Sequence, residues 1–80
     1  TVLYIRLITK LLNSAATSYR DKYELATRRI DDMRNAIKYL LALHKLHNLL
    51  GQGDQAQEVK KKALIWKDKM DADHKAGLSN

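Results

Sequence analysis

Residues 19–40, YRDKYELATRRIDDMRNAIKYL, decide the fold because their apolar and aromatic side chains return at helical spacing. The steps between them alternate four and three, which is the spacing of one helix face and of a coiled-coil seam. The stretch contains neither proline nor glycine, the two residues that most often interrupt a helix. The residues on this face are Tyr19, Tyr23, Ala26, Ile30, Met33, Ile37 and Leu40.

The same pattern extends in both directions, and we expect one long helix over about 2–50. Residues 2–12 are the most hydrophobic segment and predict a helix buried on most sides, although at this length they cannot span a bilayer, which needs about 20 apolar residues. An alternative is a break at 13–18, where Asn13, Ser14, Thr17 and Ser18 favour helix caps. The apolar pattern passes through this segment uninterrupted, so we prefer one helix.

Two glycines at 51–53 predict the end of the long helix, because glycine readily takes the left-handed conformation that ends helices. Asp54 is the predicted cap of a second helix, with Gln57 completing a pattern similar to a capping box. This helix should run from about 55 to 73 and fold back on the first.

The second helix carries an apolar stripe that includes Trp66, which we expect to pack near Leu43 and Leu50. Residues 76–80 are the predicted frayed tail. The sequence therefore predicts one small all-α domain over 1–80, a helical hairpin of a long and a shorter helix.

Eighty residues without cysteine provide a small core and no disulfide to support it. The apolar arc of the long helix is wider than one partner helix covers, and both ends of that helix are more apolar than its middle. These features predict an antiparallel homodimer, or a helical bundle, whose interface is the face given above from Tyr19 to Leu40.

A polar row runs along the opposite side of the predicted long helix, and the net charge is +6. Cationic side chains can bind the phosphates of a nucleic-acid backbone, and the amide and hydroxyl side chains between them can bind ribose hydroxyls. Arginines in this row recur every 14 residues, which is about 21 Å along a helix. Glu24 and Asp31 interrupt it. The candidate nucleic-acid-binding residues are Arg6, Lys10, Asn13, Thr17, Arg20, Thr27, Arg34 and Lys38.

The arrangement, together with the local sequence Arg28-Arg29-Ile30-Asp31-Asp32-Met33, resembles the small dimeric helical proteins of nodaviruses that suppress RNA silencing. That resemblance implies binding of double-stranded RNA by the basic face of a dimer.

Enzymatic chemistry is not expected, because no nucleophile, acid pair or glycine-rich phosphate loop stands at a functional spacing. His44 and His47 are three residues apart, but no further ligand accompanies them, so we expect structural roles, no metal and no cofactor. The sequence thus predicts a non-enzymatic dimerisation or protein-interaction module, with itself or another helical protein as partner and an intracellular, cytoplasmic location. Binding of double-stranded RNA is the alternative.

Overall fold

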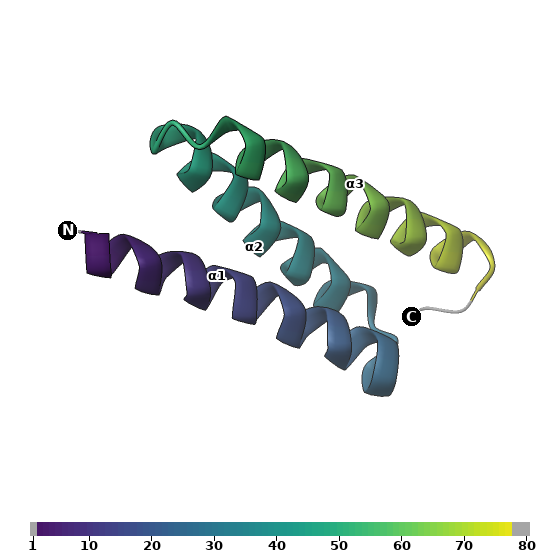
Figure 1. Ribbon diagram of the computed structural model, residues 1–80. Helices are drawn as coiled ribbons and strands as arrows, with labels where there is room; N and C mark the ends of the chain where they lie inside the picture. The colour runs from purple at the N-terminus through teal and green to yellow at the C-terminus, as the bar shows by residue number, and fades with distance from the viewer. Residues whose placement is uncertain (1, 78–80) are drawn as a thin grey trace.

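The computed structural model describes residues 2–77, which are helical along most of their length. Helix α1 spans Val2–Lys22, a π-helical turn η1 spans Tyr23–Thr27, α2 spans Ile30–Leu49 and α3 spans Gly53–Lys75. The chain runs back and forth, and α2 packs against both α1 and α3 (Figure 1). The predicted all-α class is confirmed, but these residues form three packed helices rather than two.

The predicted single helix over 2–50 is wrong, because the chain reverses at Arg28 and Arg29. Arg28 is left-handed, with φ 54°, and its amide donates to the carbonyl of Tyr23 at 3.0 Å. Arg29 is extended, with φ −81° and ψ 124°. The Thr27 hydroxyl holds the turn by donating to the Asp32 carboxylate at 2.6 Å and accepting from the Arg29 amide at 3.1 Å. The reversal therefore relies on side-chain hydrogen bonds rather than on a glycine.

The alternative break at 13–18 is also wrong, because α1 continues through that segment. Ala16 lies in the middle of it and is fully buried, as is Ala36 on α2. Both belong to one buried cluster. The capping tendency of the neighbouring polar residues is overridden by this packing.

The glycine turn forms where the sequence placed it, with Gly51 left-handed at φ 71°. The Gln52 amide donates to the His47 carbonyl at 2.8 Å, which closes the end of α2. Gln52 occupies the cap position of α3, so the predicted capping by Asp54 is wrong. Asp54 instead lies in the first turn of α3, where its negative charge interacts favourably with the positive end of the helix dipole. Residues 78–80 of the predicted tail lie outside the described residues.

The core is a buried cluster built from all the helices. Trp66 on α3 belongs to this cluster, whereas Leu43 and Leu50, its predicted neighbours, do not. Its members are Ala16, Tyr23, Met33, Ala36, Leu40, Ala63, Trp66 and Met70.

The beginning of α1 differs most from its prediction. Residues 2–12 were expected to be buried on most sides, but only Ile5, Thr9 and Leu12 are even half-buried. The large apolar side chains of Leu3, Leu7 and their neighbours face solvent. Within 2–77, each helix falls short of the length and apolarity needed to cross a bilayer.

Candidate functional site

The residues predicted as a dimer interface are mostly used inside the chain. Tyr23, Met33 and Leu40 are fully buried in the core cluster. Three more are half-buried against that cluster, namely Tyr19, Ile30 and Ile37. Ala26 is exposed. The seam found in the sequence is thus the contact between α2 and its neighbours, while dimerisation itself stays a prediction.

A different apolar surface is free of partners within the described residues. We call it the outer face of α1, and its side chains are between 45% and 78% exposed. Helical geometry of 100° per residue gathers them on one arc of about 140°. Their combined exposed area is on the order of 600 Å², the size of the largest apolar patch on a typical monomer. The outer face consists of Leu3, Tyr4, Leu7, Ile8 and Leu11.

These residues belong to the segment 2–12 that was predicted to be buried on most sides. Their hydrophobicity was the signal, and it indicated burial without indicating against what. Within one chain α2 contacts only one side of α1, the side that carries Ile5, Leu12 and Ala16.

Arg6 and Lys10 lie along one edge of the outer face. Both are exposed, and neither forms an ion pair with any residue in 2–77. They are therefore the cations of α1 that are most available to an outside partner.

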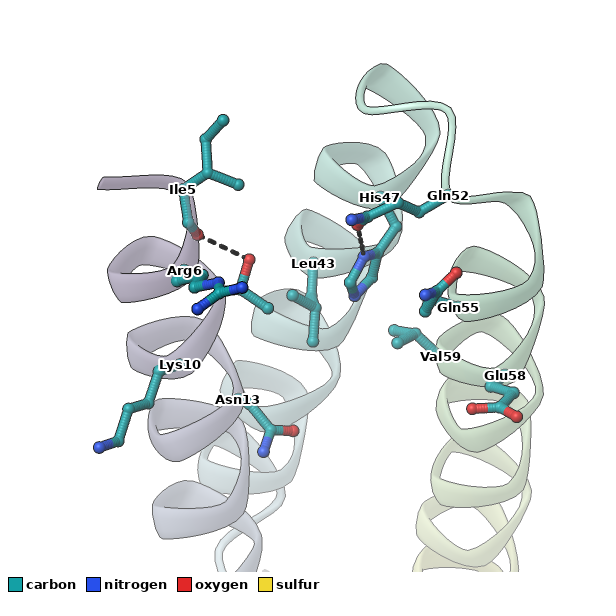
Figure 2. A pocket seen from close by; sticks show the side chains of 11 residues that line it. Ile5, Arg6, Lys10, Asn13, Leu43, His47, Gln52, Gln55, Glu58 and Val59 are labelled. Atoms are coloured by element: carbon teal, nitrogen blue, oxygen red, sulfur yellow. Dashed lines mark hydrogen bonds between the residues drawn. The ribbon is translucent and has the colours of Figure 1, made fainter. Parts of the chain in front are cut away.

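Beside that edge, a groove of about 420 Å³ separates the first half of α1 from the first half of α3. Leu43 and His47 of α2 form its floor, and Gln55 and Val59 of α3 stand opposite α1. Figure 2 shows Leu43, His47 and Val59 converging on the space between the helices. Lys10 points away from this space in the same view.

The histidines hold the α2–α3 turn that ends the groove. His47 is 8% exposed, and its Nδ1 donates to Oε1 of Gln52 at 2.7 Å, as drawn in Figure 2. His44 Nδ1 donates to the carbonyl of Ala56 at 2.9 Å, and its Nε2 accepts from the Asn48 amide at 3.2 Å. Residues 2–77 contain no cluster of three or more metal-binding side chains.

At the other end of the molecule, side chains join η1 to α3. The Tyr23 hydroxyl donates to the Asp73 carboxylate at 2.8 Å, and both side chains are buried. Arg28 and Lys69 neutralise Asp73 from 3.7 Å and 3.6 Å. Lys69 also pairs with Glu24 at 3.7 Å. Sequence reasoning missed this cluster because Tyr23 and Asp73 are 50 positions apart and no local pattern links η1 to α3.

The predicted nucleic-acid row is divided by the reversal at Arg28 and Arg29. Arg6, Lys10, Asn13, Thr17 and Arg20 remain on α1, while Arg34 and Lys38 belong to α2, which runs the other way (Figure 1). Arg6 and Arg20 keep their spacing of about 21 Å along α1, but the row does not continue in line to Arg34.

Several members of that row also have roles inside the chain. The Arg20 guanidinium lies 5.4 Å from the centre of the Trp66 ring, and Arg34 pairs with Asp31 at 3.8 Å. Thr27 is used in the turn between η1 and α2. Arg6 and Lys10 keep the clearest capacity to bind phosphate.

Residues 2–77 thus define a small three-helix protein with an unpartnered apolar helix face beside a polar groove. Residues 1–74 match the TP0443 family, and the chain belongs to that family. No curated protein and no solved structure matches it.

Proposed function

We propose that the protein is a non-enzymatic interaction module that forms an antiparallel homodimer through the outer face of α1. The observation that carries this proposal is the exposure of five large apolar side chains on one arc of one helix. An apolar patch of this size on a small domain marks a contact surface more often than a bare exterior.

The area supports a pair of identical chains. Two copies of a face on the order of 600 Å² together offer about 1,200 Å² of surface for burial, and a specific interface needs roughly 1,000 Å². A two-fold pair uses the same patch on both chains. The patch is centred on Leu7, so antiparallel helices set the Leu3 end of one copy against the Leu11 end of the other. Opposed helix dipoles favour this direction.

Sedimentation equilibrium of the unmodified chain between about 1 and 100 μM tests the proposal. We expect a dimer that dissociates on dilution. Leu7→Glu should weaken it at least about a hundredfold, because it places two carboxylates at the two-fold axis. Leu64→Glu on α3 is the matched control, since Leu64 is 53% exposed against 51% for Leu7. A monomer throughout, or equal weakening by both changes, contradicts the proposal.

Binding of a nucleic-acid backbone is a second candidate, and the unpaired state of Arg6 and Lys10 within 2–77 favours it. In an antiparallel two-fold pair the same edge of each α1 lies on the same side. The dimer would therefore gather four cations in one patch, which suits phosphates without regard to base sequence.

A gel shift with double-stranded RNA across salt concentrations tests this candidate. Changing Arg6 and Lys10 together to glutamine should weaken binding and flatten the salt dependence. The control changes Lys60 and Lys61 to glutamine, which removes the same charge from α3. If both double variants bind RNA like the parent, the α1 edge is only a solvated surface. A cytoplasmic location stays a prediction from the sequence.

A further inference from the structure

We propose that the groove between α1, α2 and α3 binds a small amphipathic monocarboxylate, with the carboxylate against α1 and the apolar body over α2. The site does not depend on the proposed dimer, because its floor lies on α2 rather than on the outer face of α1.

The size and floor of the groove suit such a ligand. Its volume of about 420 Å³ lies in the range of small-molecule sites, which is about 300–1,000 Å³. Leu43 is 3% exposed at the floor, and Ile5 and Val59 flank it from α1 and α3. An alkyl or aryl group placed here would exchange water for apolar side chains on three sides.

The charged side chains that line the groove determine which polar group of a ligand it would bind. Arg6 and Lys10 line the α1 side without ion pairs among the described residues, and Lys10 points away from the space in Figure 2. The guanidinium fork of Arg6 matches a carboxylate with two parallel hydrogen bonds. Glu58 lines the α3 side and repels a second anion. This favours a singly charged carboxylate held at the α1 wall over a doubly charged phosphate.

Amide groups complete the polar lining. Asn13 faces the space from α1 in Figure 2, and Gln55 faces it from α3. In a neutral His47 ring whose Nδ1 donates to Gln52, Nε2 is an acceptor, and it then suits a donor on the ligand better than the carboxylate itself. The groove therefore distinguishes the two ends of an amphipathic molecule.

Titration of the full chain with octanoate, followed by NMR, tests the proposal. We expect saturable binding with shifts concentrated at Arg6, Leu43, His47 and Val59. The matched probe is octylammonium, which has the same chain and the opposite charge, and it should bind at least tenfold more weakly. Preference for octylammonium, or octanoate shifts confined to the outer face of α1, overturns the proposal.

Arg6→Gln should weaken octanoate binding at least tenfold. Lys60→Gln, which removes an exposed cation of α3 away from the groove lining, should leave octanoate binding unchanged. Circular dichroism of each variant checks that the helices persist. Equal affinity of the parent and the folded Arg6→Gln variant shows that Arg6 does not hold the carboxylate.

Discussion

At the scale of single residues, Tyr23 shows how polar atoms fix the end of a small bundle. The ring is fully buried in the core, while its hydroxyl reaches the buried carboxylate of Asp73. A buried carboxylate is tolerated because Tyr23, Arg28 and Lys69 all supply donors or positive charge.

Tyr23→Phe should lower the free energy of unfolding by about 1–2 kcal/mol, because it leaves a buried carboxylate with one donor fewer. Urea unfolding followed by circular dichroism measures the loss. Tyr4→Phe is the control, since Tyr4 is 68% exposed in the single chain and should change stability by less than about 0.5 kcal/mol. The urea unfolding of both variants is measured at about 1 μM, where the proposed dimer is dissociated and the outer face of α1 is uncovered. Equal stability of both variants would mean that the Asp73 contact contributes nothing to folding.

At the scale of elements, the turn between η1 and α2 decides whether the chain is one rod or two helices. Sequence periodicity identified seven face residues from Tyr19 to Leu40, and six of them are buried or half-buried. It could not distinguish a rod that pairs with a second copy from a helix that folds back, because both bury the same face. The reversal at Arg28 could not be predicted, because arginine is not a residue type that indicates a left-handed turn.

Arg28→Gly and Arg28→Ala together isolate the strain at this turn. Both remove the ion pair with Asp73, but only glycine adopts φ 54° without cost from its side chain. The glycine variant should be more stable than the alanine variant by about 1 kcal/mol, measured by thermal and urea unfolding. Alanine equal to or better than glycine would exclude the left-handed conformation at position 28.

The candidate site also has parts that the sequence predicts and parts that depend on how the helices are placed. The cationic nature of Arg6 and Lys10 and the glycine turn at 51–53 could be read from residue type alone. The groove could not, because it requires residues from three helices whose relative placement depends on the turn at Arg28. The exposure of the outer face was unpredictable for the same reason.

At the scale of the whole molecule, the chain measures 44 × 20 × 13 Å, with a small core that leaves much of α1 uncovered. A second copy that binds only the folded chain adds to its stability by mass action. The melting temperature should therefore rise as protein concentration increases from about 1 to 100 μM, as differential scanning calorimetry would record. The Leu7→Glu variant should lack this rise, and a rise that persists in it would place the contact elsewhere.

The central position of α2 also bears on the order of folding. Within the described residues α1 and α3 each pack along α2, while their own backbones stay apart. Each packed pair joins neighbours in the chain, so loop closure is short and folding should be fast. We expect that α2 can pair first with either neighbour. Contacts that join η1 to α3, such as the Tyr23–Asp73 bond and the Glu24–Lys69 pair, should then form only after both α1 and α3 have packed on α2.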